Sequence, residues 1–156
     1  MYPTLESRAD VLRMLDDITE ARKAILARCA QLTTAQLNDP VYAGTWSVLE
    51  NLAHLAEVEE YVMRWIRKRP GVLPKEEFPP EVPADLEAVR TALDEAHAGA
   101  IAFLKANPEA VLREPCRYGR QAKEQTVGGV FFHLIEHEIG HRAFVLHKLA
   151  RLEGKC

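Results

Sequence analysis

The sequence has few cysteines, and their spacing indicates no disulfide framework. Its 156 residues include three of them, Cys29, Cys116 and Cys156, an odd number without paired spacing. Small secreted domains that depend on disulfides carry cysteines densely and in even numbers. We therefore expect free thiols and a reducing, cytoplasmic setting.

Long hydrophobic runs and an excess of positive charge are also missing. No stretch approaches the roughly 18 uninterrupted apolar residues of a membrane span, and the first residues lack the pattern of a signal peptide. The net charge of −3 offers no basic field to nucleic acid. What remains is an ordinary soluble balance of 47% hydrophobic and 28% charged residues, which predicts one domain over residues 1–156.

Strand signals are weak, whereas helical periodicity is strong. Apolar residues that recur every three to four positions predict helices over about 5–31, 47–69, 84–106 and 127–152. The inward row of the first helix includes Arg22. Ser47 with Glu50 forms a capping box for the second helix, and Thr126 caps the fourth. The fourth helix is apolar around most of its circumference, which predicts a central, buried position.

The segment between the second and third helices is rich in proline. Residues 70–83, PGVLPKEEFPPEVP, contain five prolines, and such chain is stiff and extended, at about 3.1 Å per residue. Its reach of roughly 40 Å is enough to return along a neighbouring helix. The second and third helices could therefore run parallel, joined by a crossover.

The stretch HEIGH, residues 137–141, has the H-E-x-x-H spacing of zinc peptidases. His137 and His141 lie one helical turn apart, about 6 Å along the axis and about 40° around it. Two imidazoles in that arrangement can hold one metal ion. A chance match is the competing explanation, and the buried helix around the motif favours a metal site.

The rest of a peptidase site is missing. Phe144 stands where the extended zincin motif needs a glycine to turn the chain, so His147 falls about 120° around the helix from His141. No methionine follows Met63, and only Glu153 lies downstream as an acidic ligand candidate. We read His147 as a surface or partly buried residue and predict no peptidase activity.

The third metal ligand must then come from upstream, and His54 is the best candidate. It lies beside the buried side of the second helix, and bundle cores commonly build metal sites from facing helices. His133, one turn before His137, leaves a competing set of His54, His133 and His137. His97 is read as structural. Three histidines leave a coordination position for water or substrate, as in catalytic ions, and zinc, nickel or iron accept imidazole.

Two stretches resemble the DinB/YfiT-like superfamily of damage-inducible metalloproteins. TWSVLENLAHL, residues 45–55, resembles the start of its second helix, and FFHLIEHEIGHR, residues 131–142, resembles its fourth. The resemblance implies an all-α four-helix bundle in up-down-down-up order, a divalent metal on His54, His137 and His141, and often a homodimer. Arg142 follows the pair as in the family, which favours His141 over His133, but Ala143 and Phe144 replace the usual Gly-Gln.

Characterised members of the superfamily that the sequence resembles transfer bacterial thiols such as bacillithiol, or isomerise maleylpyruvate with mycothiol. The resemblance therefore implies a metal-dependent thiol S-transferase acting on a small molecule. Glu138 could orient a ligand imidazole or take up the thiol proton, and Glu57 is a second orienting candidate. Basic residues could meet an anionic thiol: Arg113, Arg117, Arg120, Lys123 and Arg142. The alternatives are a non-catalytic metal-binding or ligand-binding stress-response bundle and a metal-dependent hydrolase.

Overall fold

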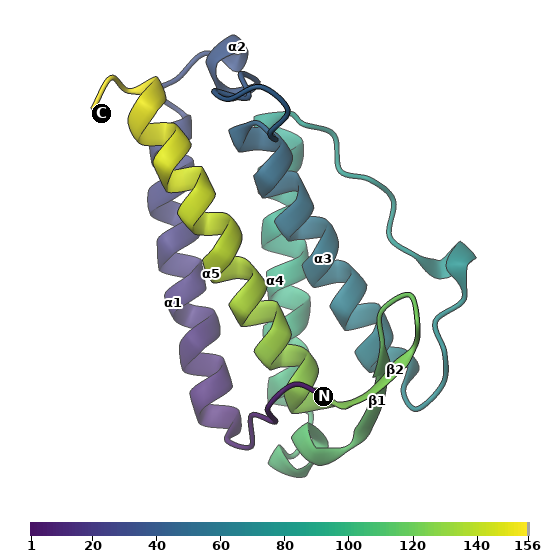
Figure 1. Ribbon diagram of the computed structural model, residues 1–156. Helices are drawn as coiled ribbons and strands as arrows, with labels where there is room; N and C mark the ends of the chain where they lie inside the picture. The colour runs from purple at the N-terminus through teal and green to yellow at the C-terminus, as the bar shows by residue number, and fades with distance from the viewer. Residues whose placement is uncertain (156) are drawn as a thin grey trace.

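Residues 1–155, which the computed structural model describes, contain four long helices in an up-down-down-up bundle (Figure 1). The first long helix rises, the next two descend side by side, and the last rises again. This order confirms the predicted fold class. The long helices are α1 (Arg8–Cys29), α3 (Val48–Lys68), α4 (Leu86–Ala106) and α5 (Val127–Leu152). The short elements are α2 (Thr34–Leu37), η1 (Lys75–Glu77), η2 (Glu109–Arg113), β1 (Pro115–Tyr118) and β2 (Lys123–Thr126).

Side-chain caps fix where the helices begin. At α3, the Ser47 hydroxyl accepts from the Glu50 amide at 3.1 Å, and the Glu50 carboxylate accepts from the Ser47 amide at 2.6 Å. The Thr126 hydroxyl accepts from the Gly129 amide at the start of α5. Both predicted caps are confirmed, and each satisfies backbone donors that would otherwise lack partners.

The proline-rich crossover holds α3 and α4 parallel. It runs back along α3 to the start of α4 (Figure 1), and α3 side chains bind its backbone. Arg64 donates to the Glu77 carbonyl oxygen at 2.7 Å, and Glu57 accepts from the Val82 amide at 2.6 Å. The crossover therefore forms one wall beside α3.

A β-hairpin, which the sequence patterns did not predict, precedes α5. β1 and β2 pair antiparallel, with Cys116 opposite Gln125. Those two residues are the buried positions of the two strands. Strands with so few buried side chains show almost no apolar alternation, which is the signal that identifies a strand.

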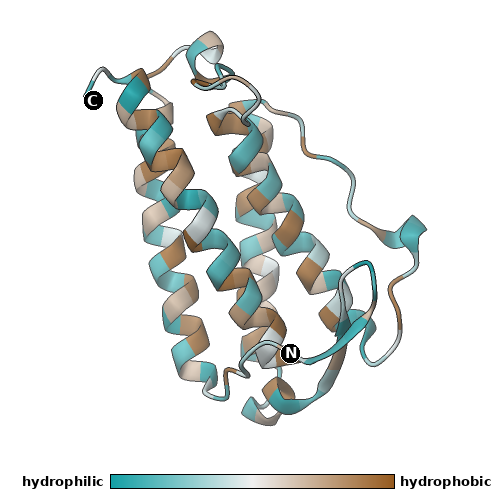
Figure 2. Ribbon diagram, viewed as in Figure 1, coloured by the Kyte–Doolittle hydropathy of each residue, from teal (hydrophilic) through white to brown (hydrophobic). Residues whose placement is uncertain are grey.

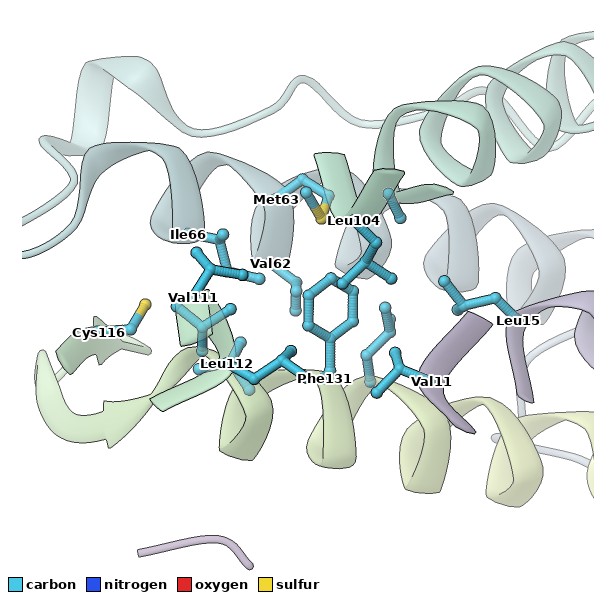
Figure 3. Packing of buried hydrophobic residues seen from close by; sticks show 14 of the residues in the cluster. Val11, Leu15, Val62, Met63, Ile66, Leu104, Val111, Leu112, Cys116 and Phe131 are labelled. Carbon is cyan, nitrogen blue, oxygen red and sulfur yellow. The ribbon is translucent and has the colours of Figure 1, made fainter. Parts of the chain in front are cut away.

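The hydrophobic core lies between the helices, whose turns alternate in hydropathy (Figure 2). Around Phe131, side chains from all four long helices and the hairpin region meet, including Val11, Val62 and Leu104 (Figure 3). A second cluster fills the other half of the bundle around Leu49 and Leu93. No helix within residues 1–155 has the length and apolarity to cross a membrane.

The prediction that α5 is central and buried all round is wrong. Ile139, Phe144 and Leu146 are 54%, 63% and 40% exposed. Each helix of a four-helix bundle keeps a face toward solvent, and on α5 that face is unusually apolar. The sequence placed these residues in the core because periodicity alone cannot distinguish exposed apolar residues from buried ones.

Each long helix also contributes one charged or polar side chain to the middle of the bundle. We call Arg22, Glu59, His97 and Glu138 the buried polar layer; their exposed fractions are 6%, 1%, 7% and 1%. Arg22 donates to Glu138 at 2.8 and 3.1 Å and pairs with Glu59 at 2.8 Å. Nδ1 of His97 lies 2.7 Å from Glu59, and its Nε2 donates to the Leu15 carbonyl oxygen. His97 is thus structural, as predicted.

The charges of this layer balance when His97 is protonated. Burial disfavours the imidazolium, but the hydrogen bond and charge of Glu59 outweigh it and raise the pKa of His97. Burial likewise opposes the Glu59 carboxylate, yet His97 and Arg22 lower its pKa. Two cations then face two anions, which is how buried charges become tolerable.

Candidate metal centre

Helices α3 and α5 bring three predicted ligands together. His54, His137 and His141, here called the histidine triad, each offer a nitrogen within 4.8 Å of the other two. Nε2 of His54 lies 3.1 Å from Nε2 of His137. The rings of His137 and His141 are 4.4 Å apart between centroids, as expected for neighbours one turn apart on a helix.

The triad keeps its imidazoles neutral. Burial and then the neighbouring His141 and His54 lower the pKa of His137 to about 3. Burial is also the main cause of the lowered pKa values of His54 and His141. Neutral imidazole is the form that binds metal. Three converging lone pairs therefore fit a divalent ion.

Side chains next to the triad set its geometry. The Asn51 amide oxygen lies 3.0 Å from Nδ1 of His141, and its amide nitrogen donates to the Ser47 carbonyl oxygen. This bond leaves Nε2 of His141 free to face the ion, the usual way in which a second hydrogen bond fixes a ligand tautomer. In contrast, Nδ1 of His137 is buried and has no hydrogen-bond partner among the described residues.

The two other histidines of α5 lie apart from the triad. The ring of His133 stacks on Tyr2 at 4.6 Å between centroids and is 5.9 Å from that of His137. His147 is exposed, and its Nε2 lies 2.9 Å from the Tyr42 hydroxyl. The structure thus groups His141, rather than His133, with the other two. The role of the triad as ligands remains a prediction.

Glu138 and Glu57 do not have the surroundings that the sequence suggested. Both Glu138 oxygens accept hydrogen bonds from Arg22 in the buried polar layer. On a helix, Glu138 points about 100° away from His137, so the motif glutamate ties α5 to α1 rather than facing the triad. The Glu57 carboxylate accepts a hydrogen bond from the Val82 amide and so holds the crossover against α3.

The basic residues predicted to meet a thiol cofactor are dispersed. Arg142, half-buried, lies four residues after Glu138 and therefore on the helix face toward α1, away from His141. Arg113 pairs with Glu6. Arg120, in the turn of the hairpin, lines a cavity together with His54.

Two cavities adjoin the triad at opposite ends. The polar cleft, of about 990 Å³, lies between α3, the crossover and the hairpin turn; among its lining residues are His54, Glu57, Tyr61, Lys75, Phe78 and Arg120. The aromatic pocket, of about 380 Å³, lies beyond the other end of the triad; it is bordered by Tyr42, Thr45, Trp46, Asn51, His141, Phe144, His147 and Lys148. Along α3, Asn51 of the aromatic pocket precedes His54, and Tyr61 of the polar cleft follows it. The triad therefore lies between the two cavities.

Several side chains around the site were not predicted from the sequence. Trp46 lies with its ring 4.7 Å from His54 and 5.9 Å from His141. The Tyr61 hydroxyl is buried without a partner among the described residues. A signal existed for Asn51: it is polar among buried leucines and lies one turn before His54. Trp46 precedes the helix and belongs to no periodic pattern.

Comparison with known proteins identifies a family. The model of the DinB superfamily matches residues 17–145. The fold is similar to that of YfiT from Bacillus subtilis, described as a probable metal-dependent hydrolase with an unusual four-helix bundle topology (TM-score 0.74, 18% identity, covering 99% of this chain and 95% of that one). No curated protein matches the chain.

Two further solved structures share the fold. A DinB-like protein from Bacillus cereus has a TM-score of 0.67 and 15% identity, covering 99% of this chain and 95% of that one. The four-helix bundle protein TT2238 has a TM-score of 0.65 and 22% identity, covering 90% of this chain and 99% of that one. At such low identities these likenesses concern the fold alone.

Proposed function

The chain belongs to the DinB superfamily, and from this premise we propose that it is a metal-dependent enzyme that transfers a low-molecular-weight thiol onto a small electrophile. One observation carries the proposal: three neutral imidazoles from two helices converge within 4.8 Å beside an open cleft. Three protein ligands leave a coordination position free, as in catalytic rather than structural sites. Zinc or nickel suits such ligands.

The chemistry divides between the ion and the chain. A bound divalent ion would stabilise the deprotonated form of a thiol near pH 7. The chain holds the reactants: Arg120 and Lys75 can pair with a carboxylate of the thiol, and Tyr61 offers its buried hydroxyl. In the transfer, the sulfur gives an electron pair to the electrophilic carbon and a C–S bond forms. The leaving group departs with the electrons of the broken bond, and the thiol proton passes to solvent.

A metal-dependent hydrolase is the second candidate. The observation in its favour is that YfiT, whose fold is similar, is described as a probable metal-dependent hydrolase. The same triad could activate water in place of a thiol. The two candidates differ in the nucleophile, so product analysis separates them.

The test combines metal analysis with a conjugation assay. Purified protein should contain about one zinc or nickel per chain, and should accelerate the reaction of L-cysteine with 1-chloro-2,4-dinitrobenzene above the uncatalysed rate. His54→Ala and His137→Ala should lose both metal and activity. His147→Ala is the matched control for the metal, since that histidine lies outside the triad and beside the Tyr42 hydroxyl, and it should retain the metal.

Two outcomes would contradict this function. Full metal occupancy in His54→Ala protein would remove the triad as the binding site. A metal-loaded protein that releases 2,4-dinitrophenol, or hydrolyses small esters, without forming the thioether would favour the hydrolase.

The remaining parts of the proposal concern setting and assembly. We infer a small-molecule substrate, no nucleic-acid partner, a cytoplasmic location and a homodimer. Sedimentation equilibrium of the metal-loaded protein tests the last point, and a monomer at micromolar concentration would contradict it.

A further inference from the structure

We infer that the two cavities divide the two reactants: the aromatic pocket takes the flat, apolar part of the electrophile, and the polar cleft takes the charged part of the thiol. This inference rests on the proposed function. It goes beyond that function by assigning a site and a chemical class to each reactant.

The aromatic pocket has the walls for a flat ring. Trp46 and Phe144 both lie near His141, with ring centroids 5.9 and 6.4 Å from it, and both border the pocket. These side chains are 48% and 63% exposed, although large apolar groups normally seek burial. An aromatic ligand in the pocket that they border would cover part of both and gain offset or edge-to-face ring contacts. Its reacting carbon would then lie beside the triad.

The polar cleft has the groups for a small, charged thiol. Arg120 and Lys75 supply positive charge, and Glu57 and Glu81 supply negative charge. The Tyr61 hydroxyl, buried and unpartnered within the described chain, offers a hydrogen bond that a ligand could complete. A carboxylate and an amine on one thiol would both find partners. A sulfur beside His54 would thus face a ring beside His141.

The first test measures binding without turnover. 2,4-Dinitroaniline, an unreactive nitroaromatic, should quench the fluorescence of Trp46 in the purified protein, since the other tryptophan, Trp65, is 1% exposed. Phe144→Ala should weaken this binding about 2- to 10-fold, the range of one lost ring contact. Leu146→Ala is the matched control: it removes an exposed apolar side chain of α5 that does not border the pocket, so affinity should not change.

The second test separates the two reactants by their KM values. Phe144→Ala should raise KM for 1-chloro-2,4-dinitrobenzene but not for iodoacetamide, which has no ring. Arg120→Ala should raise KM for L-cysteine about tenfold and leave that for cysteamine, which lacks the carboxylate, unchanged. Arg117→Ala, in the same hairpin but outside the cleft, should resemble the wild-type protein.

The outcomes distinguish this inference from the proposed function. Conjugation activity with no dinitroaniline quenching, or with quenching equal in Phe144→Ala, would overturn the division of reactants and leave the transferase standing. Quenching that depends on Phe144, in a protein without conjugation activity, would overturn the transferase and with it the assignment of the cleft to a thiol.

Discussion

At the scale of single residues, His141 and His133 have similar sequence surroundings but different places in the structure. We expect His141→Ala to weaken metal binding by orders of magnitude, because one of three converging ligands is lost. His133→Ala should change the affinity little, since its ring stacks on Tyr2. Competition with a chromogenic chelator measures both affinities. The reverse ranking would place the ion one turn nearer the start of α5.

Glu138 gives a second prediction at this scale. Glu138→Gln should lower the free energy of unfolding by up to about 3–5 kcal/mol, because it leaves the buried Arg22 with one carboxylate fewer. Glu60→Gln, which breaks a half-exposed pair with Arg64 on α3, is the control and should cost less than about 1 kcal/mol. Urea unfolding measures both. Unchanged stability with abolished conjugation would restore the catalytic role that the sequence suggested for Glu138.

The same residue bears on the peptidase question. The expected absence of peptidase activity gains further support from Glu138, whose carboxylate oxygens both accept hydrogen bonds from Arg22. A zincin needs that glutamate as a general base, worth about a hundred- to ten-thousand-fold. Metal-loaded protein should leave unstructured casein intact in a gel assay. Cleavage that is lost in Glu138→Gln would show the opposite.

The three histidines of the triad could be predicted from the sequence, but the side chains around them could not. His54, His137 and His141 could be found because helical spacing fixes which residues share a face. The partner of Glu138 could not, because a pairing with Arg22 depends on how α1 and α5 are aligned. One sign was present in the sequence: Arg22 falls in the apolar row of α1, where an unpaired charge would be very unfavourable.

At the scale of elements, two glycines of α5 should respond oppositely to the same change. A methyl group on Gly128 would overlap the backbone of Leu5, whereas nothing lies within 4 Å of that position on Gly140. Gly140→Ala should therefore stabilise the protein by about 0.5–1 kcal/mol through helix propensity. Gly128→Ala should destabilise it by about 1–3 kcal/mol, as overpacking does.

Thermal unfolding by circular dichroism measures both variants. Gly128→Ala should also free the N-terminal segment, whose Tyr2 amide donates to Gln125, and so speed proteolysis near that end. Equal effects of the two substitutions would mean that the Leu5 backbone can move away from the added methyl group without a loss of stability.

The elements that the sequence predicted are those with many residues on one buried face. The bounds of α3 and α5 agree with the predicted ranges to within one residue at each end, because Ser47 and Thr126 are strong caps. The hairpin and η2 have few buried positions each, and their place depends on packing against α5. Such segments follow from the assembled bundle rather than from local periodicity.

At the scale of the whole molecule, the buried polar layer predicts how stability depends on pH. The stability that His97 contributes is fully present below its ordinary pKa of 6.5 and is lost as pH rises through its higher folded-state pKa. The contribution of Glu59 is present above its ordinary pKa of 4.5 and is lost as pH falls through its lower folded-state value. Urea unfolding of metal-free protein should therefore show a maximum between these limits.

His97→Gln provides the control for this profile. It should remove the loss of stability on the alkaline side, since no imidazolium remains to deprotonate. An alkaline limb equal to that of the wild-type protein would assign it to another group.

One side chain from each of the four long helices meets in that layer, and we expect this arrangement to favour a single alignment of the bundle. A core of leucines alone can fit nearly as well when one helix slides by a turn, about 5.4 Å. Here the same slide would leave an uncompensated charge in the hydrophobic core, at a cost of about 3–5 kcal/mol, so we expect the layer to disfavour other alignments strongly. Replacing Arg22, Glu59, His97 and Glu138 together by Met and Leu should raise the melting temperature yet permit several alignments. In such a protein the three imidazoles would meet in only a fraction of molecules, and titration should show less than one tight metal site per chain.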